Sequence, residues 1–177
     1  METEKEEHLV DSMEDKSIYL LFILAISIHN IEEALWLPAW SKYAQRFHKH
    51  IEKHEFHFAV LIVTVMALLA TSAFIVFPNV KIISEIYFGF LGAMMFNVIF
   101  PHLAATLYLR RYAPGLLSGV LLILPINGLI LAQALNTGMI NLYEIIVSTS
   151  VVGVMILLGL PLLFRMGNIV KDYKSDE

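Results

Sequence analysis

The sequence of 177 residues contains no cysteine. Disulfide bonds, thiolate nucleophiles and cysteine-ligated zinc sites are therefore excluded. Charged residues are also scarce, because they make up 16% of the chain whereas a soluble domain has about a quarter. No basic patch is present, so nucleic acid is not an expected partner. A soluble domain is thus a poor fit to this composition.

Apolar residues are abundant and are grouped in long runs. Hydrophobic residues make up 58% of the chain, and the mean hydropathy is +0.69. Each of five apolar segments reaches the roughly 20 residues that a membrane-spanning helix needs. These segments cover about 17–38, 57–77, 83–109, 115–135 and 138–164. We therefore predict an all-α integral membrane protein whose domain, residues 17–164, is a bundle of five transmembrane helices in the lipid bilayer.

Three segments lie outside the apolar runs. Residues 1–16 hold seven carboxylates and two lysines without apolar periodicity, which predicts a mobile acidic tail. Residues 41–56 place histidines on one helical stripe and basic residues on another face, which predicts an interfacial amphipathic helix. Residues 165–177 form the C-terminal tail.

The distribution of lysine and arginine predicts the orientation. Nine of these residues fall in the 39–56 loop, the 110–114 turn and the C-terminal tail, whereas three fall on the opposite side. Because cytoplasmic loops carry the excess of basic residues, the N-terminus is expected outside and the C-terminus in the cytoplasm. A bacterial-type plasma membrane is the expected location.

The most unusual stretch is His29-Asn30-Ile31-Glu32-Glu33, which lies inside the first apolar run. Charged groups at the centre of a bilayer cost roughly 2.5–3.5 kcal/mol each on insertion scales, and they usually mark a site. Positions i, i+3 and i+4 share one helix face. We therefore expect His29, Glu32 and Glu33 to converge on one point.

The third apolar run supplies possible partners at the same depth. It carries Asn97 and His102, with Pro101 between them, and proline in a membrane helix usually kinks it. Both this run and the first run enter from outside, so His102 and His29 are expected in the cytoplasmic halves of their helices. His54 and His57 are expected just to the cytoplasmic side of these two histidines. Arg110 and Arg111 follow the third apolar run.

This group of residues has three interpretations. Imidazole and carboxylate at helical spacing suit a divalent metal such as Zn, Fe or Mn. A buried carboxylate also suits general acid–base chemistry. The structural alternative is a polar cluster that hydrogen-bonds helices together.

The motif also resembles a known family. His29-Asn30-Ile31-Glu32-Glu33, inside the first span of a small multi-pass protein, is similar to the signature of the HXXEE-motif membrane proteins. That resemblance implies a membrane-embedded enzyme, an Asn–His pair and an arginine. Asn97 and His102 resemble the pair with one additional residue between them, which a break at Pro101 would absorb. Either Arg110 or Arg111 matches the arginine, and the similarity extends over most of 17–135.

These observations lead to one hypothesis and one rival. We predict a metal-dependent membrane hydrolase or oxidase that acts on a lipid-like or membrane-borne substrate. His29, Glu33 and His102 would bind the metal, and Glu32 or Glu33 would act as the general base. Asn97, Arg110, Arg111, His54 and His57 would support the site, without an organic cofactor. The rival is a small proton- or cation-coupled transporter that uses the same carboxylates, with Glu144 as a second station near the outer face. The sequence decides neither the reaction, the metal nor the oligomeric state.

Overall fold

The computed structural model describes residues 2–44 and 51–175 of the chain, with side chains for 17–43 and 51–171. All regular elements in this part are helical. They are α1 (Glu2–Trp40), the 3₁₀ turn η1 (Ser41–Ala44), α2 (Lys53–Val76), α3 (Lys81–Asn97), the π-helical turn η2 (Val98–Leu103), α4 (Ala104–Leu109), α5 (Leu116–Ser118), the π-helical turn η3 (Gly119–Ile123), α6 (Leu124–Asn136) and α7 (Leu142–Ser175).

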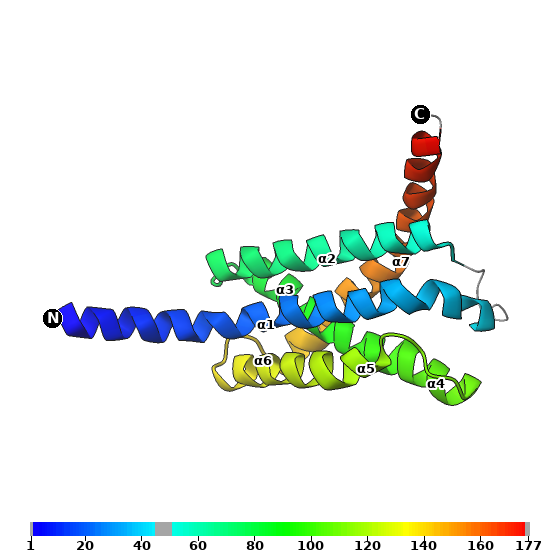
Figure 1. Cartoon of the computed structure of the whole chain (residues 1–177). Coiled ribbons are helices and arrows are strands. Elements are labelled where there is room, and N and C mark those ends of the chain that lie inside the picture. The colour runs from blue at the N-terminus through cyan, green and yellow to red at the C-terminus, as the bar shows by residue number, and fades with distance from the viewer. Residues whose placement is uncertain (1, 45–50, 176–177) are drawn as a thin grey trace.

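The helices form one bundle in which successive spans run in opposite directions (Figure 1). α1 packs against α2, α3 packs against α7, and α7 also contacts α2. The α5–η3–α6 unit lies along α1. Residues 41–44, the α4–α5 turn and the C-terminal part of α7 therefore lie at one end of the bundle. The connections at 77–80 and 137–141 lie at the other end.

Five helical stretches are long and apolar enough to cross a membrane, as the sequence predicted. They comprise Ser17–Tyr43, Lys53–Val76, Lys81–Leu109, Leu116–Asn136 and Leu142–Lys171. The all-α fold with five such helices is confirmed. Apolar runs of this length favour helices, because backbone groups placed in a bilayer must be hydrogen-bonded within the segment itself.

Both ends of the bundle carry more helix than the sequence indicated. The backbone of 2–16, predicted as a tail, continues α1, and α7 continues through most of the predicted C-terminal tail to Ser175. Adding residues to an existing helix needs no new nucleation, so a stable apolar span extends readily into polar flanks.

The predicted interfacial helix over 41–56 is not continuous. Ser41–Ala44 form a 3₁₀ turn, residues 45–50 lie outside the described part, and Ile51 and Glu52 are not helical. α2 begins at Lys53, because Glu52 and Glu55 form a reciprocal capping box there. His54 and His57 consequently belong to the first turns of a spanning helix.

The third span is broken where Pro101 predicted a kink. Phe100 has non-helical dihedral angles (φ −135°, ψ 113°) within η2, and the Phe100–Pro101 peptide bond is cis. Proline lacks the N–H that a continuous helix requires. The break places Asn97 and His102, five residues apart, on the same side of the span.

The two halves of the interior differ in chemistry. The half near the 77–80 connection is packed with the buried rings of Tyr19, Phe22, Phe74, Tyr87 and Phe88. Phe74 and Tyr87 stack with their ring centroids 4.5 Å apart. Buried polar side chains of the other half include His29, Glu32, His102 and Ser118.

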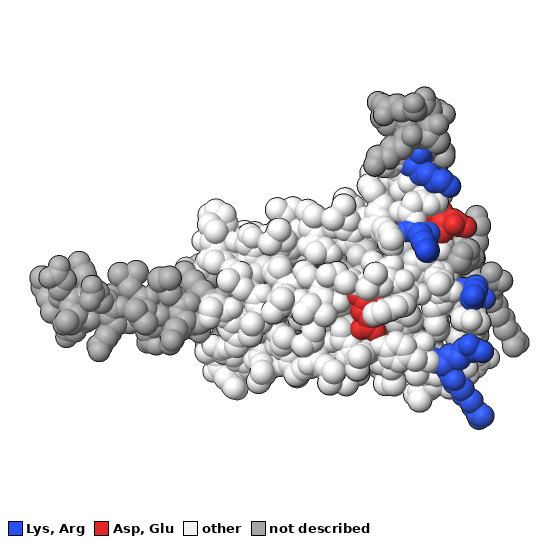
Figure 2. Space-filling view, in the orientation of Figure 1, with Lys and Arg blue, Asp and Glu red and all other residues white. Residues whose placement is uncertain are grey.

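Charged side chains gather at the end of the bundle that lies beyond this polar half. Figure 2 shows the lysines and arginines of one face at the end where α1 and α4 finish. The described basic residues at this end are Lys42, Lys53, Arg110, Arg111, Arg165 and Lys171, whereas Lys81 begins α3 at the opposite end.

Candidate metal centre

Three side chains from two helices converge in the polar half of the bundle. Glu33 Oε1 lies 2.7 Å from His102 Nε2 and 3.6 Å from His29 Nε2. The ligand atoms of all three lie within 4.8 Å of one another, close enough to share one metal ion. We call His29, Glu33 and His102 the His–Glu cluster. It combines the predicted i, i+4 pair of α1 with the histidine of η2.

Asn97 lies between the two imidazoles. Its Nδ2 is 3.1 Å from His102 Nε2 and 3.4 Å from His29 Nε2. The amide therefore contacts the same edges of both rings that face Glu33. The contacts place Asn97 beside the cluster, and its supporting role stays a prediction.

Glu32 does not join the cluster. Its Oε1 accepts hydrogen bonds from the Tyr112 hydroxyl and from the Gly115 N–H, the latter at 2.8 Å. Its Oε2 accepts from the Ser118 N–H at 2.9 Å and from the Ser118 hydroxyl. We call Glu32, Tyr112, Gly115 and Ser118 the Glu32 clamp. The predicted convergence of both glutamates on one point is thus wrong, because three residues of the α4–α5 turn and α5 hold Glu32 on another side.

Tyr112 donates a hydrogen bond to Glu32 and keeps its own proton. Partial burial and the hydrogen bond to Glu32 raise its pKa to about 12, so the phenol keeps its proton at neutral pH. Neither Tyr112 nor Ser118 belongs to a motif in the sequence. The only sequence signal was the Ala113-Pro114-Gly115 turn, which lies at the same end of the bundle as Glu33.

Gly115 forms one wall of the cluster. Its φ of +95° lies in the left-handed region, which favours glycine. A Cβ at this position would lie 2.8 Å from His102 Cε1, 3.0 Å from His29 Cε1 and 3.1 Å from Glu33 Cγ. Only glycine therefore leaves space for the three cluster side chains to meet.

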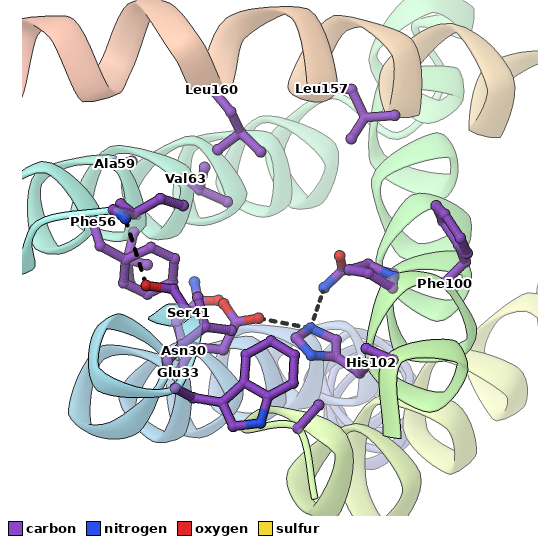
Figure 3. A pocket seen from close by; sticks show the side chains of 18 of the residues that line it. Asn30, Glu33, Ser41, Phe56, Ala59, Val63, Phe100, His102, Leu157 and Leu160 are labelled. Atoms are coloured by element: carbon purple, nitrogen blue, oxygen red, sulfur yellow. Dashed lines mark hydrogen bonds and ion pairs between the residues drawn. The ribbon is translucent and has the colours of Figure 1, made fainter. Parts of the chain in front are cut away.

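The cluster borders a large apolar cavity. The cavity has a volume of about 800 Å³ and lies between α1, α2, the third span and α7. Figure 3 shows Glu33 and His102 facing each other at its wall, with Leu157 and Leu160 of α7 across from them. Of the two glutamates, Glu33 lines the cavity and Glu32 does not.

The structure does not bring the two arginines to the cluster. Arg110 is exposed and ends α4 in the left-handed conformation (φ 49°). The Arg111 guanidinium lies 4.4 Å from the centre of the Tyr43 ring. Neither side chain lines the cavity. The geometry therefore gives neither arginine a contact with the cluster.

The two predicted supporting histidines also have other partners. His54 Nε2 lies 2.5 Å from Asn168 Oδ1 of α7. His57 Nε2 lies 2.8 Å from the Ala34 carbonyl oxygen and accordingly donates to it. Both join α2 to a neighbouring helix, and neither supplies an atom to the cluster.

The chain matches one protein family and one relative among known proteins. Residues 20–130 match the family described as "Protein of unknown function with HXXEE motif". The chain is 47% identical over 147 residues to "Uncharacterized protein YrkK" of Bacillus subtilis (strain 168), an alignment that covers 83% of this chain and 93% of that protein. No solved structure matches the chain. These matches confirm the resemblance carried by His29, Glu32 and Glu33: the chain belongs to the HXXEE-motif family.

Proposed function

We propose that the chain is a metal-dependent membrane enzyme whose His–Glu cluster binds a divalent ion and acts on a lipid-like substrate. One observation carries the proposal: three potential ligands converge at the wall of an apolar cavity. The family and the five apolar helices provide the setting.

The donor set suits a catalytic ion. Two imidazoles and one carboxylate are the protein ligands of many catalytic zinc sites and of non-haem iron oxygenases. Three protein ligands leave coordination positions open, whereas structural zinc sites are closed by four. A divalent ion here would supply Lewis acidity next to the substrate.

The cavity favours an apolar substrate. Its lining is dominated by side chains such as Leu37, Val63, Leu157 and Phe164, with Glu33 and His102 among a few polar groups. Ligand pockets of this kind bury apolar parts of the ligand and use a few polar groups to orient its reactive part. A lipid chain in the cavity would place its polar end at the cluster.

The two glutamates receive different roles in this proposal. Glu33 lines the cavity and is the carboxylate ligand. Glu32 accepts four hydrogen bonds, which leaves it poorly placed to take a proton from a substrate. We therefore revise the sequence-based assignment of Glu32 as a general base.

Metal analysis of the purified protein tests the proposal. Roughly one zinc, iron or manganese ion per chain is expected in protein purified in detergent through an affinity tag without histidine, and His29→Ala and His102→Ala should reduce it to background. His57→Ala is the matched control, because His57 donates to a carbonyl outside the cluster. A wild-type protein that takes up none of these metals on reconstitution would rule the proposal out.

The rival transporter is supported less well. Glu144 Oε1 forms an ion pair with Lys81 Nζ at 2.8 Å, and Glu144 forms reciprocal hydrogen bonds with Asn141 at the start of α7. The buried aromatic rings of the core fill the half of the bundle on the Glu144 side. Both features suggest that Glu144 stabilises a helix end.

Replacing Glu144 distinguishes the two functions. We expect Glu144→Gln to leave metal content unchanged, because its carboxylate is at the opposite end from the cluster. It should lower stability only slightly, since ion pairs between exposed side chains contribute little. Metal content and thermal unfolding measure these effects. Loss of proton-coupled or cation-coupled uptake in proteoliposomes would instead favour the carrier.

The proposed orientation follows from the basic end of the bundle. If Lys42, Lys53, Arg110 and Arg111 face the cytoplasm, the N-terminus is outside and the C-terminus inside, in a bacterial-type plasma membrane. The His–Glu cluster then lies in the cytoplasmic half of the bilayer. Residues 41–44 and 110–115 would border the cytoplasm.

A further inference from the structure

The two adjacent glutamates of the motif, Glu32 and Glu33, have different hydrogen-bond partners. We infer that Glu32 is a positioning residue that acts through Ser118 to hold His29 as the tautomer with its proton on Nδ1. The Nε2 lone pair of His29 then faces Glu33 and His102. The inference concerns side chains of this chain alone, and its consequence for metal binding rests on the proposed function.

Glu32 is surrounded by hydrogen-bond donors. Two backbone N–H groups, of Gly115 and Ser118, and two hydroxyls, of Tyr112 and Ser118, all approach its carboxylate. The ionised carboxylate satisfies all four donors at once, because each of its oxygens accepts from one backbone N–H and one hydroxyl. Glu32 is 8% exposed, so water can replace little of this pattern.

The Ser118 hydroxyl can donate to only one of its neighbours. A hydroxyl has one hydrogen to donate and two lone pairs to accept. Ser118 Oγ donates that hydrogen to Glu32 Oε2. The Gly115 carbonyl oxygen lies farther from Ser118 Oγ, at 3.5 Å. With the hydrogen directed to Glu32, the contact of Ser118 Oγ with His29 Nδ1, at 3.2 Å, is one in which the ring nitrogen donates and Ser118 Oγ accepts.

The other ring nitrogen of His29, Nε2, faces the cluster. With Nδ1 protonated, the neutral imidazole carries its lone pair on Nε2. That atom faces the Asn97 amide at 3.4 Å and Glu33 Oε1 at 3.6 Å. A metal-binding histidine commonly donates its other N–H to a carbonyl, carboxylate or water, which fixes the ring for the ion. Here a serine hydroxyl links the ring to the carboxylate of Glu32.

Nitrogen NMR of the histidine rings tests the tautomer in metal-free protein. The sample is full-length protein in detergent, labelled with ¹⁵N in the imidazoles, at a pH where the ring is neutral. The His29 signals are identified by their absence from His29→Asn protein. We expect Nδ1 to carry the proton in the wild type. A proton on Nε2 overturns the inference without any variant being made.

Variants then test whether Ser118 is the link. Ser118→Ala removes the acceptor, so the Nδ1-protonated form should lose its predominance and zinc affinity should fall about 10- to 100-fold. Ser148→Ala is the control, because Ser148 is a comparably buried serine whose hydroxyl donates to the Ile145 carbonyl. An unchanged tautomer in folded Ser118→Ala protein refutes the link.

The tautomer and metal measurements separate the two proposals. If the wild-type ring has the expected tautomer and the protein takes up no metal, the proposed function fails and the inference stands. If metal binds and His29 carries its proton on Nε2 in the metal-free protein, the inference fails and the proposed function stands.

Discussion

Gly115→Ala is expected to abolish stoichiometric metal binding and to destabilise the protein by about 2–5 kcal/mol. The left-handed backbone conformation costs an alanine roughly 1–2 kcal/mol. The new methyl group would also approach His102 Cε1 at 2.8 Å and His29 Cε1 at 3.0 Å. The two rings must move apart to accept it, and a metal requires ligand atoms at about 2.0–2.2 Å.

Two other glycines separate backbone strain from crowding. Gly138 also has a positive φ (+70°), but a Cβ there meets nothing within 4 Å. Gly138→Ala should therefore be destabilising without loss of metal. Gly128 lies inside α6 with open space around it, and Gly128→Ala should be neutral or stabilising by up to about 1 kcal/mol.

Thermal unfolding in detergent and metal content are the two measurements for this series. Metal content that falls in Gly115→Ala but not in Gly138→Ala assigns the loss to crowding of the cluster. Full metal content in Gly115→Ala protein would contradict the geometry of the candidate metal centre.

Glu32→Gln and Glu33→Gln are expected to fail in different ways, although the two residues are adjacent and the substitutions are isosteric. Glu32→Gln replaces one accepting oxygen by an NH₂ group among four donors. Two donors would then face the NH₂ group without an acceptor. Each such buried donor costs about 1–3 kcal/mol, so the loss of stability should reach about 2–6 kcal/mol. The α4–α5 turn should loosen, because the clamp joins it to α1.

Glu33→Gln should mainly affect the metal. Its side chain is 13% exposed beside the cavity, and its Oε1 contacts the imidazoles of the cluster. Loss of the negative ligand is expected to lower metal affinity by at least 100-fold, with a change in metal-free stability below about 1 kcal/mol.

Calorimetric metal titration and unfolding of the metal-free proteins distinguish the two variants. Stability should decrease more in Glu32→Gln, and metal affinity should decrease more in Glu33→Gln. Equal effects of both variants on both properties would contradict the separation of roles. Glu85→Gln provides a control, since Glu85 pairs with Lys81 at the opposite end of the bundle.

The sequence was sufficient to predict the helices and one pair of the candidate metal centre. Five apolar runs of the required length predict five spans, because a segment that crosses a bilayer has few alternatives to a helix. The i, i+4 spacing of His29 and Glu33 predicts their proximity on α1. The depth of His102 was also accessible, since it follows from the direction of each span.

Three features were beyond such reasoning. Helical spacing places Glu32 and Glu33 almost equally near His29, so it could not show that they separate. The arginines following the third span match the family's arginine by position in the sequence, but the α4–α5 turn directs Arg111 to Tyr43. Tyr112 and Ser118 offered no motif, because their roles arise only where the turn meets α1.

Sequence by itself determined the properties that are local along the chain: apolar length, helical period, and the break at Pro101. Tertiary structure alone decided which glutamate reaches the cavity and which side chains surround the other one. It also placed the two imidazoles so close to position 115 that only glycine fits there. These outcomes depend on contacts between residues far apart in sequence, such as His29 with Asn97 and His29 with Ser118, 68 and 89 residues apart. Such contacts depend on how helices pack, and helical periodicity carries no information about the neighbouring helix.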